Sequence, residues 1–272
     1  MPAQEAIDLT SDTQETARDF KEETRTRRLK SAYLDANPTI CMERALAFTR
    51  SYKETEGQAT TVRLAKAFRL ACETITLNIF EDELIVGTHG SGRRMGALVP
   101  EISWKWLAKE LDTIQTRPRD PYYIDPEQER LFVEEIIPYW KGKSLEENAL
   151  ARFPEETLKI GVDTDILDTE MKWRSHVGEI TPDFQDIIFP KGFRAICNEA
   201  KEKLKTLDYT NDEDLDKIDY YKAAIEACEG IITLGKRYAE YAADMAKKEQ
   251  DPARKKELET IAANCRRVPE YS

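Results

Sequence analysis

The chain has few of the residues on which metal centres and disulfide-rich folds are built. Its 272 residues include only two histidines, and its five cysteines contain no C-x-x-C pair. A histidine-rich metal centre and a Ser-His-Asp triad are therefore disfavoured. The cysteines are odd in number and widely spread, which fits reduced and mostly buried thiols better than a disulfide framework. They are Cys41, Cys72, Cys197, Cys228 and Cys265.

The sequence also lacks long apolar runs and an excess of positive charge. No apolar stretch approaches the roughly 20 residues that span a bilayer, and the N-terminus has no basic region followed by an apolar one. Lys and Arg number 41 against 52 Asp and Glu, giving a formal net charge of -11. Nucleic acids and anionic membranes are bound through clustered positive charge, so neither is expected as a partner.

What the sequence does contain is helical periodicity. Residues 1–25 are expected to be a flexible acidic tail. Beyond them, apolar residues recur at steps of three and four, with Thr39 as the expected N-cap of the second helix and Phe68 in the buried face of the third. This pattern predicts helices at 26–35, 40–56, 61–73, 102–111, 127–139, 193–207, 212–248 and 252–266. The one-sided apolar stripe of 212–248 indicates core packing.

A short β-hairpin is predicted among these helices. Apolar residues alternate at 75–79, and a second short strand is expected at 84–87 after the polar turn 81–83. The glycine-rich loop 88–94 carries two arginines and could cradle an anion, but a flexible connector is the favoured interpretation because the spacing is not that of a Walker loop. The expected fold is therefore mainly α with a short β-hairpin.

Two kinds of side-chain cluster are candidates for chemistry. Adjacent glutamates such as Glu146 and Glu147 point to different sides of a helix, so they are expected to be solvated charges. Residues 173–179 combine a cation, an imidazole, a carboxylate and an aromatic ring in an irregular stretch. Such convergence can serve substrate binding, and an ordinary surface loop with ion pairs is the equally weighted alternative.

Several motifs occur in an order that resembles one enzyme family. They include Glu43-Arg44-Ala45, Asp82-Glu83-Leu84-Ile85-Val86-Gly87, Arg117-Pro118, Pro138-Tyr139-Trp140, Lys191-Gly192-Phe193 and Gly235-Lys236-Arg237-Tyr238-Ala239. Over residues 26–272 the sequence resembles the N-terminal part of glycyl radical enzymes, the pyruvate formate-lyase-like superfamily, in its dehydratase and choline trimethylamine-lyase branch. The resemblance implies that 26–272 form the N-terminal helical portion of a ten-stranded α/β-barrel fold, a pyruvate formate-lyase domain that is truncated here.

The resemblance implies an anaerobic radical chemistry. In this family an S-adenosylmethionine iron–sulfur activating enzyme installs a radical on a backbone glycine, and a cysteine thiyl radical then abstracts a substrate hydrogen. Both loops are expected to be absent from this chain, so it is expected to hold no catalytic residue, bind no cofactor or metal, and be inactive alone. The implied partners are a small-molecule substrate and the activating enzyme, with a homodimer expected for the full-length form.

One substrate-side position is implied within the chain. Many family members carry Gly-His followed by Asp-Tyr, where this sequence has Gly178-Glu179 followed by Asp183-Phe184. Glu179 thus replaces the substrate-contacting histidine, and His176 lies three residues away. A carboxylate fits a cationic or hydroxylated substrate better than a carboxylate substrate. The implied reaction is cleavage of a C–N or C–O bond, similar to choline trimethylamine-lyase or to diol and hydroxyproline dehydratases.

A second hypothesis is not catalytic. The chain would then be a helical binding protein or a complementing subunit of a split enzyme. Under the first hypothesis, the isolated chain is expected to expose apolar surface where the missing barrel would pack. The expected location is the cytoplasm, with a bacterial microcompartment as the alternative if the N-terminal tail is a targeting segment.

Overall fold

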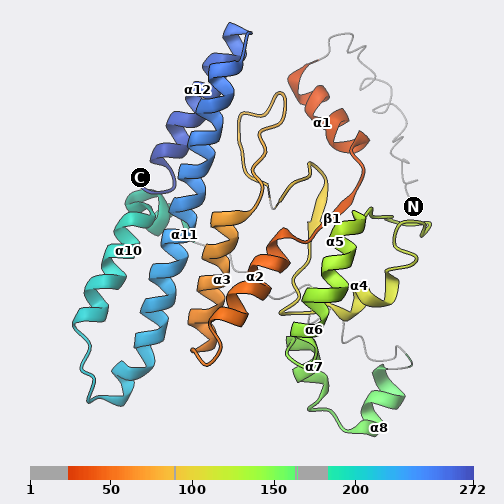
Figure 1. Ribbon diagram of the computed structural model, residues 1–272. Helices are drawn as coiled ribbons and strands as arrows, with labels where there is room; N and C mark the ends of the chain where they lie inside the picture. The colour runs from red at the N-terminus through yellow and green to blue at the C-terminus, as the bar shows by residue number, and fades with distance from the viewer. Residues whose placement is uncertain (1–23, 89, 163, 165–182) are drawn as a thin grey trace, which may run out of the picture.

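A computed structural model describes residues 24–88, 90–162, 164 and 183–272. Over these residues the protein is mainly helical, with one small two-stranded sheet (Figure 1), which confirms the expected fold class apart from the hairpin. None of the described helices is both long and apolar enough to cross a bilayer.

The described elements follow one another along the chain, and apart from residues 163–183 the connections between them range from none between α5 and η1 to 20 residues between α3 and β2. They are α1 (Arg25–Asp35), β1 (Thr39–Cys41), α2 (Glu43–Glu54), α3 (Thr60–Thr74), β2 (Met95–Ala97), α4 (Lys105–Glu110), α5 (Pro126–Leu131), η1 (Phe132–Ile136), α6 (Ile137–Trp140), α7 (Leu145–Leu150), α8 (Glu155–Thr157), η2 (Leu158–Val162), η3 (Phe184–Ile188), α10 (Phe189–Lys205), α11 (Asp212–Lys248) and α12 (Pro252–Arg267). The elements labelled η are single π-helical turns.

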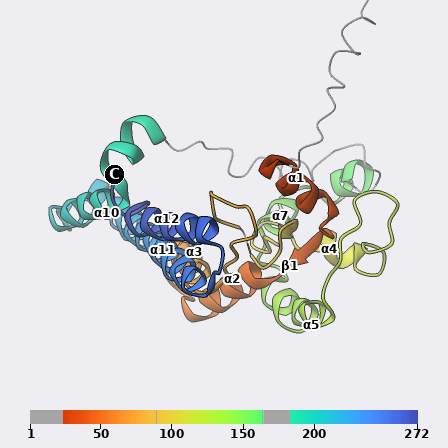
Figure 2. The ribbon, with the colours of Figure 1, turned by 90° about the horizontal axis from the view of Figure 1, so that it is seen from above.

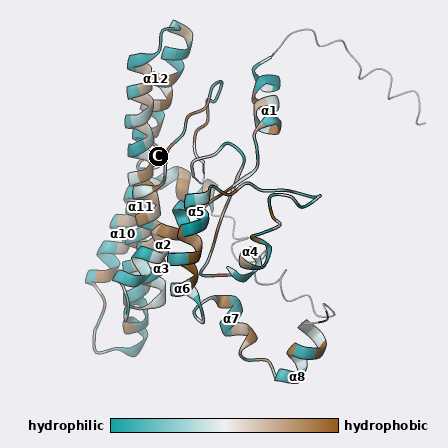
Figure 3. Cartoon of the chain, turned by 45° about the vertical axis from the view of Figure 1, so that its right-hand side comes forward, coloured by the Kyte–Doolittle hydropathy of each residue, from teal (hydrophilic) through white to brown (hydrophobic). Residues whose placement is uncertain are grey.

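The long helices gather on one side of the molecule. Helix α11 packs against α3, α10 and α12, and α2 packs against α3. The view from above shows this group on one side of the sheet, with α4 and α5 on the other (Figure 2). Hydrophobic and hydrophilic residues alternate along α11 and α12 (Figure 3), as expected for helices that bury only one face.

Local signals explain why these helices begin and end where they do. Asn211 caps α11 by accepting a hydrogen bond from the N–H of Glu213, and Asp251 caps α12 in the same way with Pro252 in the first turn. The helices expected at 61–73, 212–248 and 252–266 are confirmed within one residue at each end. Phe68 was wrongly placed in the core, because its side of α3 faces solvent and the residue is 36% exposed.

The sheet differs from the predicted hairpin. Strands β1 and β2 are parallel and pair Thr39 with Met95, whereas 75–79 and 84–87 form no strand. Thr39 is therefore a strand residue rather than an N-cap, and α2 begins four residues later at Glu43. The β-branched pair Thr39-Ile40 follows Pro38, which fits an extended backbone better than a helix start.

The predicted first strand is extended without a strand partner. The backbone N–H and hydroxyl of Thr76 both donate to the carboxylate of Glu43, at 2.7 Å each, and Ile79 packs beside Tyr238 of α11. The alternating apolar side chains of 75–79 thus reflect docking onto helices. A side-chain carboxylate takes the place of the ladder hydrogen bonds that the pattern led us to expect.

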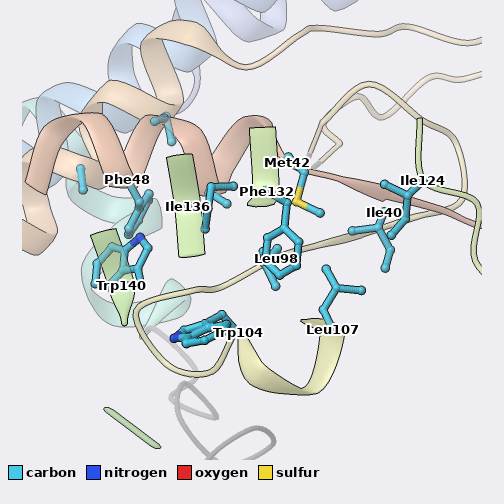
Figure 4. Packing of buried hydrophobic residues seen from close by; sticks show 14 of the residues in the cluster. Ile40, Met42, Phe48, Leu98, Trp104, Leu107, Ile124, Phe132, Ile136 and Trp140 are labelled. Carbon is cyan, nitrogen blue, oxygen red and sulfur yellow. The ribbon is translucent and has the colours of Figure 1, made fainter. Parts of the chain in front are cut away.

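Buried apolar residues form two clusters. The larger one lies where α2 meets the sheet and the helices from α4 to α6 (Figure 4); its labelled members include Ile40, Phe48, Leu98, Leu107, Phe132 and Trp140. The smaller one joins α11 and α12 through Tyr238, Ala242, Leu258 and Ile261. Leu77 and Leu234 pack against both clusters, so the two parts share apolar contacts.

The glutamate pair at 146–147 is a correction. Glu146 is only 7% exposed and accepts a hydrogen bond of 2.6 Å from Ser103. Glu147 accepts from the indole N–H of Trp104 at 3.1 Å and from the hydroxyl of Ser144 at 2.8 Å. Contrary to expectation, the two carboxylates are therefore not solvated. Their hydrogen bonds hold the start of α7 against the start of α4. The adjacent spacing of the two glutamates does not predict their burial, because each carboxylate has a different hydrogen-bond partner from a distant part of the sequence.

The cysteine prediction is confirmed. All five thiols are free, and four of them are buried, with Cys265 half-buried. Burial raises the pKa of Cys72 and of Cys228 to about 11. Because the thiolate is the reactive form, these two side chains are packing residues.

Arg237 provides the clearest test of how α11 holds α3. Its guanidinium donates to the backbone oxygens of Cys72 at 2.7 Å and Ile75 at 2.8 Å, where α3 ends. We expect Arg237→Met to lower the free energy of unfolding by about 1–3 kcal/mol, because two half-buried carbonyls lose their donors. The measurement is urea denaturation. Arg50→Met is the matched control, because Arg50 is 71% exposed and its ion pair with Glu54 lies at the surface. Equal losses for both variants would contradict this role.

Candidate functional site

The two predicted substrate-binding residues, Glu179 and His176, lie outside the described residues, as does the rest of the 173–179 cluster. The described chain resumes at Asp183, whose side chain accepts a hydrogen bond of 2.9 Å from the N–H of Asp186 and so starts η3. Residues 183–194 are the first described residues after this cluster along the chain; we call them the border segment, and their anchoring can be followed atom by atom.

The border segment presents apolar side chains to solvent. Phe184 and Phe189 contact each other with ring centroids 5.7 Å apart, and they are 45% and 67% exposed. Ile187 is exposed between them. Clustered apolar side chains at a surface indicate a contact with something else.

Helix α10 has a sharp kink at Gly192. Gly192 has φ 69° and ψ 161°, in the left-handed region that favours glycine. The C-terminal residues cross this point so closely that a Cβ on Gly192 would lie 2.7 Å from the oxygen of Glu270. The N–H groups of Phe193 and Arg194 donate to the backbone oxygens of Pro269 and Glu270, at 3.0 Å each. The first free N–H groups after the kink are thus satisfied by the chain's own C-terminal segment.

A network of charges surrounds this crossing. Arg194 donates to Glu229 of α11 at 2.8 Å and to Glu270 at 3.0 Å. Lys201 adds a second cation on Glu229 at 3.0 Å, and Lys236 adds one on Glu270 at 2.7 Å. We call these five residues the Arg194 network. It joins α10, α11 and the C-terminal segment.

The electrostatics of the network favour ionised carboxylates. Partial desolvation acts to raise the pKa of Glu229, but hydrogen bonds from Arg194 and Lys201 outweigh it and hold the pKa at about 2. Glu270 is only 6% exposed, and its pKa is lowered for the same balance of reasons, with Lys236 the stronger of its two cations. Buried carboxylates with paired cations are held in one geometry.

Two sequence motifs meet at this crossing. Gly192 comes from the first, Lys191-Gly192-Phe193, and Gly235 comes from the second, where a Cβ would lie 2.5 Å from the Cδ of Pro269. Both glycines allow close passage of the C-terminal segment. Sequence analysis found the two motifs but missed Arg194, Glu229 and Glu270, because only the tertiary structure brings them together.

The glycine-rich loop resembles a connector more than an anion cradle. Its two arginines cover different rings: Arg93 lies 4.4 Å from the ring centre of Phe80 and Arg94 lies 5.9 Å from that of Tyr33. Gly90 packs so close to Cys41 that a Cβ would be 2.7 Å from its Sγ. In the part of the chain that the structure covers, no cluster of three or more His, Cys, Asp or Glu could hold a metal ion.

The family is decided by comparison with known proteins. A family model described as pyruvate formate lyase-like matches residues 15–272. The chain belongs to the pyruvate formate lyase-like family. This confirms the resemblance inferred from the ordered motifs, and the relatives and structural neighbours are glycyl radical enzymes of this superfamily.

The pyruvate formate lyase-like chain is similar to several characterised lyases and dehydratases. It is 36% identical over 244 residues to the isethionate sulfite-lyase of Nitratidesulfovibrio vulgaris, covering 87% of this chain and 29% of that protein. It is 33% identical to the trans-4-hydroxy-L-proline dehydratase of Clostridioides difficile, covering 91% and 31%. Among solved structures, the B12-independent glycerol dehydratase of Clostridium butyricum matches with a TM-score of 0.85 at 34% identity, covering 91% and 31%.

The matches agree in how much of each protein they cover. The chain spans about 30% of the length of the relatives it matches, while nearly all of the chain is used in each match. The structural neighbours have the pyruvate formate-lyase barrel fold, so the helices described above correspond to one portion of that architecture.

Gly192 offers a test of the crossing. We expect Gly192→Ala to lower the free energy of unfolding by about 3 kcal/mol or more, because the strain of positive φ is joined by a clash with backbone. The control is Gly57→Ala, where φ is +85° but open space surrounds the new Cβ. That variant should lose only about 1–2 kcal/mol of the free energy of unfolding, the cost of a positive φ for a residue with a Cβ. Thermal and urea denaturation measure both, and equal effects would contradict the close crossing.

The low pKa of Glu229 predicts a pH dependence. A carboxyl whose pKa is depressed in the folded state stabilises the fold above its unfolded pKa of about 4.5, and this contribution is lost as pH falls toward 2. We expect acidification from pH 5 to 2.5 to remove at most about 3 kcal/mol through this group. The Glu229→Gln variant should show a shallower decline of melting temperature over this range. A decline as steep as the wild type's would contradict the prediction.

Proposed function

We propose that this chain is the N-terminal part of a glycyl radical lyase that cleaves a C–N or C–O bond of a small hydroxylated substrate. The observation that carries the proposal is similarity over 87–91% of the chain to lyases and dehydratases of this family, of which the chain covers about 30%. In this proposal the remaining two thirds of a family-length enzyme supply the radical-carrying glycine and cysteine. The 272 residues are inactive on their own.

Glu179 and His176 are the substrate-side residues of this proposal. The Glu179 carboxylate would accept a hydrogen bond from a substrate hydroxyl or pair with a cationic group. The Arg194 network holds α10 in place fifteen residues further along the chain. A glycyl radical installed by an S-adenosylmethionine iron–sulfur enzyme would supply the hydrogen-abstracting chemistry.

The leaving group stays open within the proposal. A choline-like substrate fits the charge of Glu179, whereas hydroxyproline and glycerol are named for relatives or neighbours of similar identity. The isethionate sulfite-lyases, at 36–37% identity, point to a hydroxylated sulfonate as the rival substrate class, and release of sulfite from it would break a C–S bond instead. The negative charge of isethionate would be repelled by a carboxylate at position 179. Comparing isethionate with choline is therefore the sharpest test of the substrate class.

A binding or complementing subunit of a split enzyme is the alternative function. The exposed apolar side chains of Phe184, Ile187 and Phe189 favour a protein that packs against further polypeptide. A complementing subunit differs from the first proposal only in whether the remainder is on the same chain, and both predict activity when the two parts are brought together. A non-catalytic binding protein predicts no activity in that assembly.

Activity in an assembled enzyme tests the proposal. The chain is joined to the remaining two thirds of the Nitratidesulfovibrio vulgaris isethionate sulfite-lyase and activated anaerobically with that enzyme's activating partner. We expect an organic-radical signal by electron paramagnetic resonance, and turnover of choline, propane-1,2-diol or trans-4-hydroxy-L-proline. The chain alone should give neither. Turnover of isethionate alone, which breaks a C–S bond, would contradict the proposed C–N or C–O cleavage.

The role of Glu179 is tested in the same assembly. We expect Glu179→Gln to lower kcat/KM by about 10–1,000-fold, because a charged contact to substrate is lost, while the radical signal persists. Glu155→Gln, in the exposed acidic first turn of α8, is the matched control and should leave turnover unchanged. A radical signal without turnover of choline, propane-1,2-diol or trans-4-hydroxy-L-proline would contradict the proposed function.

A further inference from the structure

Strand β1 is bonded on both of its edges. The N–H of Thr39 donates to the oxygen of Arg94 at 3.0 Å, on the β2 side. The N–H of Ile40 donates to the oxygen of Tyr123 at 2.9 Å, and the N–H of Tyr123 donates to Pro38 at 2.8 Å, on the opposite side. The sheet is thus three parallel segments wide at this point, with β1 in the middle.

The register shows which groups of β2 face outward. Thr39 lies opposite Met95, Ile40 opposite Gly96 and Cys41 opposite Ala97. In a parallel pair, a residue bonds to the two residues that flank its partner. Thr39 and Cys41 therefore engage β2 through Arg94, Gly96 and Leu98. The N–H and C=O groups of Met95 and Ala97 point to the outer edge, where no described residue bonds with them.

The opposite edge of the sheet is already covered in part. The N–H of Tyr122, which points away from β1, donates to the oxygen of Ile114 at 3.0 Å. The outer edge of β2 is therefore the open edge of the described sheet. It consists of Met95, Gly96 and Ala97, with none of the charged or proline residues that protect a solvent-facing edge.

A hollow lies over one face of the sheet, from β2 across β1 to Tyr122. It measures about 190 Å³ and is lined by Ile40, Gly96, Ala97, Leu98, Trp106, Arg117 and Tyr122. Gly96 leaves the space open, since a Cβ there would find its nearest contact, Tyr122, at 3.9 Å. Purely parallel sheets occur almost only with both faces covered. The hollow is a gap in the cover of one face, and together with the open edge it indicates an incomplete part of a buried sheet.

We propose that the outer edge of β2 takes up a further parallel strand, which pairs with Met95 and Ala97 and places a side chain in the hollow over Gly96. The strand comes from the other two thirds of a family-length enzyme, because the chain spans only about 30% of its relatives. This inference rests on the proposed function to the extent that the chain works together with that remainder. Addition of a strand to a free edge is a common recognition mode.

Amide hydrogen exchange measures the pairing directly. The probe is the assembled protein described above, compared with the chain alone. We expect the amides of Met95 and Ala97 to exchange about 100-fold or more slowly after assembly. The amide of Gly96 is the internal control, because it already faces β1 and should be protected in both samples.

Three results would overturn the inference. Slow exchange of Met95 and Ala97 in the monomeric chain alone would mean that one of its own segments covers the edge. Protection that rises with the concentration of the chain alone would mean that a second copy covers it. Fast exchange of both amides in the assembled protein would mean that nothing pairs there.

A proline substitution provides an independent test. Ala97→Pro removes only an outward N–H, and proline is tolerated on edge strands, so the melting temperature of the chain alone should stay within a few degrees of the Ala97→Ser control. In the assembled protein, Ala97→Pro should lower the melting temperature below that of Ala97→Ser. An equal melting temperature for both assembled variants would overturn the inference.

The test is separable from that of the proposed function, because exchange and melting need no turnover. A protected edge in an assembly without lyase activity would count against the proposed function alone. An active assembly with an unprotected edge would count against the strand pairing alone.

Discussion

Close approach to α11 is the constraint on which the helical part of this protein depends. A Cβ on Gly230 would lie 3.0 Å from the Cα of Arg69 in α3, and one on Gly235 would lie 2.5 Å from Pro269. Glycine at these two positions lets a neighbouring helix and the C-terminal segment touch the backbone of α11. Because α10 and α12 pack on the same helix, the spacing of the whole group is set along one axis.

The Arg194 network holds the start of α10 and the C-terminal segment on this packed group of helices. One guanidinium serves two carboxylates that belong to different elements, Glu229 in α11 and Glu270 in the C-terminal segment. Removing either carboxylate leaves the other to hold the arginine, whereas removing Arg194 leaves the buried Glu270 and the half-buried Glu229 with one lysine each. The network therefore fixes the direction in which the chain leaves η3.

The long helices could be predicted from the sequence because their signal is local. In α11 and α12 the apolar stripe and the capping residues Asn211 and Asp251 lie within the element itself. The sheet could not be predicted, since β1 and β2 have three residues each and lie more than 50 residues apart. The alternation at 75–79 misled the prediction because docking onto helices produces the same pattern as strand pairing.

The candidate site shows the same limit. Family resemblance could name Glu179, and motif order could point to Gly192 and Gly235. The partners of Arg194 are 35 and 76 residues away, and no local pattern states that they meet. Burial of Glu146 was missed for the same reason, since its partner Ser103 lies 43 residues earlier.

The pairing of α3 with α11 also has a consequence for biosynthesis. Helix α3 ends at Thr74, whereas the part of α11 that touches it around Glu226 and Gly230 follows some 150 residues later. At a translation rate of about 5–20 residues per second, the contacting part of α11 is synthesised roughly 8–30 s after α3, and until then the apolar side of α3 lacks this contact. During that interval α2 is the neighbour that can shield it, and a nascent-chain chaperone has its longest opportunity to bind.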